Sequence, residues 1–500
     1  MLTASFPPGH FEWLAWFALV PLLMSLEETS PSLAFKLGLT TGVAHYLTLI
    51  YWIIVALKHY GNIHVVVSLG LLVMLCSYLA LYPAFFAAVL AYLRGSHFLL
   101  LKMAGLWVGL EYVRAKILTG FPWCLLGYTQ YNHPEVIQIA DVAGVYGLSF
   151  VLVLSNGLIY ALFRSRRFHK RGALKWEMPV VILIALFTVT YNFQRISAGE
   201  ENQKTTKVAI VQGNIDQSVK WNPDFQEKTI QIYRNLTRRA AKLGPDLVVW
   251  PETSVPFFFQ DQLDMALQLI QAAQQAQADL IFGSPAYGKE GGHATYYNRA
   301  YHILPDGHVS GYYDKVHLVP FGEYIPLKRF LPFVHRLVMS AGDFSPGKKM
   351  TPLALSDLSA GILICFEIIF PEIARAQVKN GADLLVNLTN DAWYGRTSAP
   401  YQHFAMAVLR AVENGRPLIR AANTGFSGFI DHQGKIVGRG ELFTEQVLAQ
   451  EMVSGQTRLT LYTRFGDVFA ICLLVGTALN LLTAFYYNRK SGRFRGGAHR

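Results

Sequence analysis

Long apolar segments flank a stretch of ordinary polar composition, and this contrast constrains the fold more than any motif does. Residues 1–195 form a series of apolar runs, residues 196–465 have the composition of a globular domain, and 466–487 is apolar again. A helix needs about 20 mostly apolar residues to cross a bilayer. The sequence therefore predicts a transmembrane helical domain (1–195), a large domain outside the membrane (196–465), and a last helix with a basic tail (466–500).

Seven segments are candidate membrane-spanning helices. The run Ile63–Leu93 contains no Asp, Glu, Lys or Arg, whereas the run 97–116 carries Lys102, Glu111 and Arg114. Charges inside a span either face a buried interior or lie near the interface, where long side chains reach water. Both readings are open for 97–116. The candidates are 11–26, 33–57, 63–93, 97–116, 140–163, 178–194 and 466–487.

The net charge of +11 is concentrated beside apolar segments, which argues for membrane orientation and against nucleic-acid binding. Basic residues flanking spans mark the cytoplasmic side, so the loop 164–175 and the tail 488–500 are expected there. The span 178–194 then leads out of the cytoplasm and the span 466–487 leads back, so residues 196–465 are expected on the extracytoplasmic side of the membrane. The two clusters are Arg164, Arg166, Arg167, Lys170, Arg171 and Lys175, and Arg489, Lys490, Arg493, Arg495 and Arg500.

Four cysteines are present, and only Cys365 lies in the polar domain. Cys76 and Cys472 fall in apolar runs, and Cys124 is in the membrane-proximal part. The polar domain therefore cannot form an internal disulfide. No spacing of Cys and His is typical of a metal site, and we expect neither a metal nor a cofactor.

The polar domain alternates short buried-strand patterns with segments of helical length and spacing. Such alternation predicts an α/β layered domain around a buried sheet. The expected strands are 207–212, 246–250, 278–284, 361–366 and 383–388, and the expected helices are 224–243, 260–276, 370–380 and 401–415.

Three of the strand ends carry reactive groups: Glu252, Lys315 and Cys365. Each alone has an ordinary structural explanation, as a cap, a surface lysine or a small core residue. Together they supply a base, a donor for an oxyanion and a nucleophile, which are the requirements of cysteine-based acyl transfer. No histidine stands in a comparable context to form a Cys–His pair.

The order Glu, Lys, Cys at strand ends resembles the nitrilase superfamily. Four segments are similar to apolipoprotein N-acyltransferases in particular, and the resemblance covers nearly the whole chain, including the apolar part that soluble nitrilases lack. It implies an α/β nitrilase-like (αββα sandwich) extracytoplasmic domain. The segments are Val211–Trp221, Leu318–Glu323, Asn387–Gly395 and Gly120–Trp123.

The resemblance implies a reaction. Glu252 would act as general base, Cys365 as nucleophile, and Lys315 would stabilise the oxyanion. An acyl chain would pass from a phospholipid, commonly phosphatidylethanolamine, through a cysteine thioester to the α-amino group of a diacylglyceryl-cysteine on an apolipoprotein. The resemblance also implies a monomer in the bacterial inner membrane, with the catalytic domain on the periplasmic side.

Five further residues are candidates for supporting roles. The two glutamates would hold Lys315 or orient Glu252, and the other three would form a pocket. Ordinary packing or turn formation is the alternative for each. The candidates are Glu323, Glu367, Trp221, Asn298 and Trp393.

Two features depart from the family. Its first helix would precede Met1 here, which would also explain why counting spans back from the loop 164–175 places the N-terminus outside. We therefore expect a helix upstream of Met1 in the natural chain, rather than that 11–26 fails to span. The residue after the nucleophile, often Tyr in the family, is Phe366.

The apolar segments 255–259 and 330–339 lie in expected loops, where they either dip into the membrane or pack on the domain. A membrane-anchored amidase, with water as second nucleophile, is the alternative function. A catalytically inactive binding protein is a third, which the three reactive residues disfavour.

Overall fold

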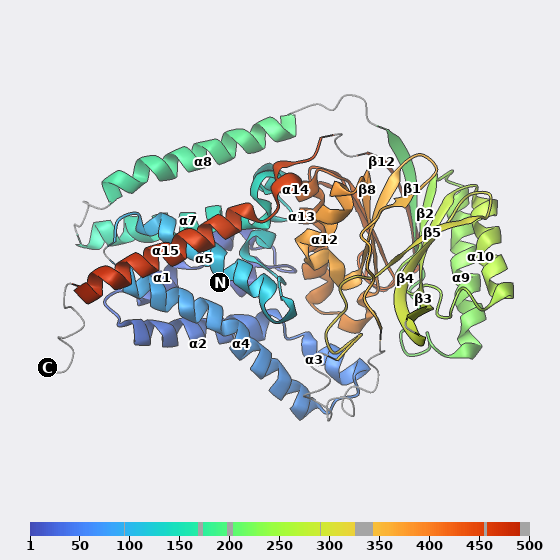
Figure 1. Cartoon of the computed structure of the whole chain (residues 1–500), viewed down its shortest axis with the longest axis horizontal. Coiled ribbons are helices and arrows are strands. Elements are labelled where there is room, and N and C mark those ends of the chain that lie inside the picture. The colour runs from blue at the N-terminus through green and yellow to red at the C-terminus, as the bar shows by residue number, and fades with distance from the viewer. Residues whose placement is uncertain are drawn as a thin grey trace.

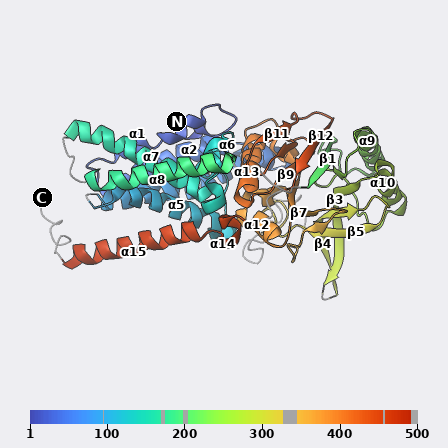
Figure 2. The ribbon, with the colours of Figure 1, turned by 90° about the horizontal axis from the view of Figure 1, so that it is seen from above.

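A helical bundle and a two-sheet domain lie side by side in the computed structural model (Figure 1). The structure describes residues 1–94, 96–168, 174–197, 204–290, 292–325, 344–454 and 458–490. The C-terminal helix α15 (Val468–Lys490) returns from the two-sheet domain and runs along the bundle, as does α8 (Leu174–Ser197) (Figure 2). The predicted combination of a polytopic helical part with an α/β nitrilase-like domain is confirmed.

Within the described ranges, four helices are long and apolar enough to cross a membrane. Exposed side chains on two of them are large and apolar, including Leu183 and Phe193 of α8 and Leu482 of α15. An exposed apolar surface of this kind suits a lipid environment rather than water. The four helices are α4 (Val65–Tyr92), α7 (Ala140–Phe168), α8 and α15.

Three predicted spans differ from the structure. Segment 97–116 forms the helix Leu99–Lys116, which is not among the helices long and apolar enough to cross. Segment 11–26 is wrong as a span, because it breaks into η2 (Glu12–Trp16) and α1 (Val20–Ser25) and its apolar helical length is too short to cross. Segment 33–57 becomes α2 (Pro31–Leu49) followed by a helical piece, Ile53–His59, that is bent from it by 56°.

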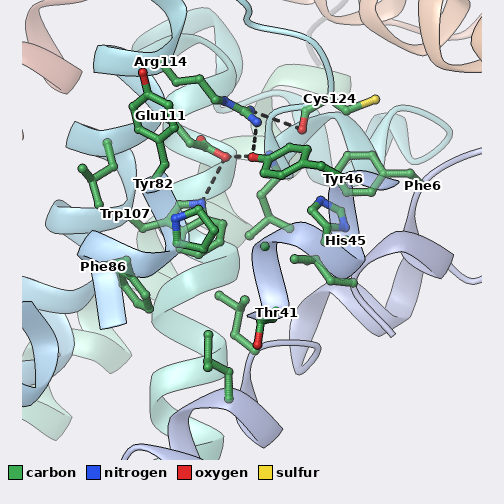
Figure 3. Close-up of a pocket in the computed structure, with 17 residues that line it drawn as sticks. Phe6, Thr41, His45, Tyr46, Tyr82, Phe86, Trp107, Glu111, Arg114 and Cys124 are labelled. Carbon is green, nitrogen blue, oxygen red and sulfur yellow. Dashed lines mark hydrogen bonds between the residues drawn. The ribbon is translucent and has the colours of Figure 1, made fainter. Parts of the chain in front are cut away.

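Helix α5 (Leu99–Lys116) carries Glu111 and Arg114, two of its four charged residues, on a buried face. Trp107 Nε1 and the backbone N–H of Leu126 donate to Glu111 Oε1 at 3.0 and 2.8 Å. Arg114 donates to the hydroxyl of Tyr46, and both charged side chains line a cavity of about 40 Å³ (Figure 3). The sequence left open whether these charges face a buried interior or lie near the membrane interface. Glu111 and Arg114 face a buried interior.

The second domain consists of two six-stranded sheets with orders β12-β1-β2-β3-β4-β5 and β11-β10-β9-β8-β7-β6. Buried residues of both sheets pack against each other in one apolar core, and helices cover the outer faces. The first sheet contains β1 (Thr205–Gln212), β2 (Leu247–Val249), β3 (Asp279–Glu290), β4 (His293–Ile303), β5 (Val309–Asp314) and β12 (Gln446–Val453). The second contains β6 (Leu353–Ala354), β7 (Ser359–Ile364), β8 (Leu384–Thr389), β9 (Leu418–Ala422), β10 (Gly428–Ile430) and β11 (Ile436–Arg439).

Helices α9 (Pro223–Ala241) and α10 (Leu263–Ala276) cover the first sheet, and α12 (Pro371–Lys379) and α13 (Ala399–Asn414) lie between the second sheet and the bundle (Figure 1). All the expected strands and helices of this domain exist, with ends that shift by a few residues. The remaining short elements are η1 (Thr3–Ser5), α3 (Ile53–Val55), η3 (Ala56–Tyr60), η4 (Ile117–Thr119), η5 (Leu126–Gln130), α6 (Pro134–Ile137), η6 (Cys365–Ile369), η7 (Asp391–Tyr394) and α14 (Leu461–Phe465).

Helix α13 is buried almost throughout, although it carries Arg410 and Glu413. Arg410 Nη2 donates to Glu413 Oε1 at 2.9 Å and to the hydroxyl of Tyr128 at 2.8 Å. The backbone N–H of Val145 donates to Glu413 at 2.9 Å. The interface between the bundle and the sheet domain is therefore polar and satisfied at this point.

The apolar segments expected to meet the membrane have different outcomes. Phe257 and Phe259 are buried in the core of the sheet domain, so this segment packs on its own domain. Segment 330–339 lies outside the described residues. Most side chains of the two basic clusters also lie outside them, and the orientation stays a prediction.

Replacing Arg114 by Met should destabilise the protein by about 3–5 kcal/mol, because Glu111 would remain buried without its cationic neighbour. Lys116→Met on the same helix is the matched control. Lys116 pairs with Glu372 at 2.8 Å in a one-third exposed position, where an ion pair contributes about 0–1 kcal/mol. Thermal unfolding in detergent measures both, and equal losses of stability would contradict the assignment.

Candidate active site

A buried lysine organises the site at one end of the first sheet. Lys315 follows β5 and is only 1% exposed. Its Nζ lies 2.9 Å from Glu323 Oε2 and 3.7 Å from Glu252 Oε1. Burial disfavours the ammonium, but the two carboxylates outweigh it and raise the pKa of Lys315. The lysine is therefore a fixed positive charge.

Asn298 on β4 links the two carboxylates. Its Nδ2 donates to Glu252 Oε1 at 2.8 Å and to Glu323 Oε1 at 2.9 Å. Its backbone carbonyl accepts from the N–H of Lys315 at 2.9 Å. Within the described residues, Glu252 Oε2 is buried and has no hydrogen-bond partner. One oxygen of Glu252 is thus held in place, and the other is left to accept a proton.

The loop after β2 presents Glu252 through a close approach of two backbones. Thr253 has a φ of +48°, and Gly283 of β3 lies directly against this turn. A Cβ at Gly283 would stand 2.4 Å from the backbone nitrogen of Thr253. Only glycine fits, and this fit sets where the Glu252 carboxylate lies.

Cys365 begins η6, immediately after the end of β7, with a φ of +50° that a non-glycine residue rarely adopts. It is 6% exposed. Burial raises the pKa of its thiol, Glu252 raises it further, and Lys315 opposes both. The thiol is therefore protonated at rest and needs a base to become a nucleophile.

Glu367 joins the Lys315 segment to the Cys365 segment. Its Oε1 accepts from the N–H groups of Val316 and His317 at 2.7 and 3.1 Å, and its Oε2 accepts from Ile364 N–H at 2.7 Å. Burial raises the pKa of Glu367 to about 7. Of the two supporting glutamates, Glu323 binds Lys315 directly, and Glu367 binds the backbone on either side of the site.

A cavity of about 390 Å³ is lined by none of the three reactive residues, but its wall includes Pro285, which pairs with Asn298 across β3 and β4. Trp221, which is half exposed, also forms part of its wall. Asn298, expected to form a pocket, bridges carboxylates and does not line this cavity. Trp393 lies on η7, is 36% exposed and does not line it either. The lining residues are Trp221, Gln226, Pro256, Phe257, Phe258, Asp261, Gln262, Pro285, Tyr296 and Phe344.

Lys220 was missed by the sequence analysis. It is 1% exposed, and its Nζ donates to the backbone carbonyl of Glu252 at 3.3 Å. Burial lowers its pKa to about 8, against the attraction of Glu252 and Cys365. A lysine in a polar segment before Trp221 reads as a surface residue, and no signal in the sequence separates it from one.

Family models match both parts of the chain. The apolipoprotein N-acyltransferase N-terminal domain matches residues 1–158, and the carbon-nitrogen hydrolase model matches residues 207–462. An apolipoprotein N-acyltransferase of Geobacter metallireducens is 47% identical over 98% of this chain and 94% of its own length. The chain belongs to the apolipoprotein N-acyltransferase family.

A second member of this family, from Nitrosomonas europaea, is 34% identical over 95% of the chain and 93% of its own length. Among solved structures, a carbon-nitrogen hydrolase from Helicobacter pylori covers 50% of this chain and 89% of its own, with 20% identity and a TM-score of 0.38. The resemblance stated from the sequence is confirmed, and the protein is an acyltransferase.

The stability of the protein should carry a pH-dependent contribution from Glu367. In the unfolded chain this carboxyl ionises near its ordinary pKa, whereas in the folded protein it stays protonated up to about pH 7. The contribution of Glu367 to the free energy of unfolding is fully present below the pKa of this carboxyl in the unfolded chain. It falls by about 3 kcal/mol as the pH rises and is lost above about pH 7.

Glu367→Gln should remove this component, and thermal unfolding in detergent between pH 4.5 and 8 measures it. Glu372→Gln, at the exposed ion pair with Lys116, is the control and should keep the wild-type slope. An unchanged slope in Glu367→Gln would assign the pH dependence to other groups.

Proposed function

We propose that this protein moves an acyl chain from a phospholipid, through a thioester on Cys365, to the α-amino group of a diacylglyceryl-cysteine on an apolipoprotein. The observation that carries the proposal is the buried arrangement of a protonated thiol, a carboxylate with one free oxygen and a fixed ammonium. The names of the relatives supply the acceptor, because they are apolipoprotein N-acyltransferases.

In the first half-reaction Glu252 Oε2 takes the proton of the Cys365 thiol, and the thiolate attacks the ester carbonyl of the phospholipid. Negative charge develops on the carbonyl oxygen, and the Lys315 ammonium stabilises it. When the C–O bond breaks, Glu252 returns the proton to the leaving alcohol. The products are an acyl-Cys365 thioester and a lysophospholipid.

In the second half-reaction the uncharged α-amine of the acceptor attacks the thioester carbonyl. Lys315 again faces the oxyanion, and Glu252 accepts the proton that the amine loses. The C–S bond breaks, the new amide leaves, and the proton on Glu252 restores the Cys365 thiol. Asn298 and Glu323 keep Glu252 and Lys315 in register for both steps, because each contacts one or both of them.

The neighbouring cavity suits an acyl chain, since aromatic and proline side chains such as Trp221, Phe257 and Tyr296 form much of its wall. The exposed apolar helices provide a route by which both lipid substrates reach the site from the bilayer. We place the catalytic domain on the periplasmic face of a bacterial inner membrane, on the basis of the basic clusters beside the apolar segments.

The alternative of a membrane-anchored amidase is not favoured. Such an enzyme would share the carbon-nitrogen hydrolase domain, and its second nucleophile would be water. The similarity to apolipoprotein N-acyltransferases extends through the apolar helices of residues 1–158, which hydrolysis of a soluble amide does not require.

Purified protein incubated with phosphatidylethanolamine alone should gain the mass of one acyl chain. The adduct should be sensitive to hydroxylamine, as a thioester is, and absent from Cys365→Ala. Adding a diacylated lipopeptide should discharge it and give a triacylated peptide. Absence of the adduct, together with hydrolysis of simple amides, would favour the amidase.

Lys315→Met should slow formation of this adduct by about 10²–10³-fold, because the oxyanion would lose its cationic partner. Lys349→Met, at an exposed position outside the site, is the control and should acylate at the wild-type rate. The measurement is the single-turnover rate of the mass shift. A loss below about threefold would move the oxyanion role from Lys315 to other donors.

A further inference from the structure

A second buried charged cluster lies beneath Cys365 and takes no part in the reaction described above. Asp391, His403 and Arg420 are each fully buried. Arg420 Nη2 donates to Asp391 Oδ2 at 2.8 Å, and His403 Nδ1 lies 3.0 Å from Asp391 Oδ1 and 2.9 Å from Arg420 Nη2. Arg420 also donates to Asn387 Oδ1. Three polar side chains buried together at these distances form a rigid unit.

This unit contacts the nucleophile from two directions. The hydroxyl of Thr389 donates to Asp391 Oδ1 at 3.1 Å and also interacts with the Cys365 thiol. Helix α13, which carries His403, packs against η6, which begins at Cys365, and the buried Nε2 of His403 has no hydrogen-bond partner among the described residues. Because Cys365 has a left-handed backbone conformation, neighbouring groups must hold it there.

One ring face of His403 meets the membrane part of the protein. The indole of Trp123 stacks on the imidazole, with ring centroids 5.4 Å apart and planes 26° apart. Trp123 Nε1 donates at 2.8 Å to Oε1 of Gln402, the residue before His403. Trp123 is fully buried, and Cys124 and Leu126 in the same loop accept from Arg114 and donate to Glu111, respectively. The charged pair of α5 therefore anchors this loop (Figure 3).

We propose that His403 is a positioning residue for Cys365, and that Trp123 of the membrane part holds it in place. Trp123 packs against a ring face of the imidazole, while Asp391 and Arg420 contact its Nδ1 edge. Held in this way, the imidazole supports the left-handed backbone of Cys365. The membrane part thus completes the active site as well as anchoring it. The inference rests on the proposed role of Cys365 as nucleophile.

Variants of the full-length protein in detergent separate the two contacts of His403. His403→Phe keeps a ring against Trp123 and removes the polar contacts, whereas His403→Gln keeps a polar group. Trp123→Leu removes the stack and leaves His403 in place, and Trp123→Phe preserves an aromatic ring. Tyr128→Phe is the matched control. It removes only the hydrogen bond that the Tyr128 hydroxyl accepts from Arg410, which lies on the same helix as His403 and at the same interface.

Two measurements are made on each variant that keeps the wild-type thermal unfolding transition. The first is the rate of Cys365 alkylation by iodoacetamide, followed by intact mass, which needs no lipid substrate. The second is the rate of acyl-adduct formation as a function of phosphatidylethanolamine concentration. His403→Phe and Trp123→Leu should slow alkylation and the maximal acylation rate about tenfold or more, with the half-saturating phospholipid concentration within twofold of wild type.

His403→Gln, Trp123→Phe and the Tyr128→Phe control should stay within about threefold of wild type. If Trp123→Leu raises only the half-saturating phospholipid concentration, Trp123 is a lipid contact and the inference fails. It fails equally if alkylation is unchanged in both disruptive variants. A third outcome separates the two proposals. If the variants slow alkylation but phosphatidylethanolamine does not acylate even the wild-type protein, His403 remains a positioning residue and the proposed function is wrong.

Discussion

The burial of the Lys315 ammonium is the constraint on which the rest of the site depends. A lysine with 1% exposure is tolerated only if its charge is compensated, and Glu323 at 2.9 Å and Glu252 at 3.7 Å compensate it. Asn298 then has to bridge the two carboxylates, which would otherwise repel each other across a short distance. The end of β5 and the turn after β2 are thereby held together by charge, and Glu367 joins the turn after β7 to the segment after Lys315 through hydrogen bonds to backbone N–H groups.

Under the proposed mechanism, the same electrostatics keep the Cys365 thiol unreactive until a substrate is present. Burial and Glu252 keep the Cys365 thiol protonated, and Lys315 only partly offsets them. A site of this kind does not accumulate a free thiolate, which would be open to oxidation. In the proposed reaction, proton transfer to the free oxygen of Glu252 becomes favourable when a substrate carbonyl is positioned to take the negative charge.

Sequence reasoning singled out Glu252, Lys315 and Cys365 as candidates because each follows an apolar strand, a signal that is local in the chain, and the structure brings Glu252 and Lys315 within 3.7 Å. It could not assign the contacts of Asn298 and Glu367, since their partners are 25 to 54 residues away and no periodicity encodes such pairs. The span at 11–26 failed for a related reason. Composition measures how apolar a segment is, but not where its helix breaks.

Helix α13 shows the limit of pattern reading most clearly. Its polar residues would ordinarily mark a solvent-facing side, yet Arg410 and Glu413 are fully buried. A helix between a sheet and another domain is apolar toward the sheet and carries polar groups that fit specific partners on the other side. Here the partners are groups of the bundle, which is remote in sequence, and the pattern of α13 alone cannot show whether its polar residues meet water or protein.

Buried carboxylates satisfy backbone groups in irregular parts of the bundle, one of them from the catalytic domain and the other from the bundle itself. Helix α7 breaks at Gly144, where φ is +64°, just before Val145. Glu413 of the catalytic domain accepts the N–H of Val145 at 2.9 Å, just as Glu111 accepts the N–H of Leu126 at 2.8 Å. Irregular backbone in an apolar environment persists only when such acceptors are supplied. The catalytic domain therefore completes the fold of the bundle at Val145, and the contact of Trp123 with His403 shows the dependence in the opposite direction.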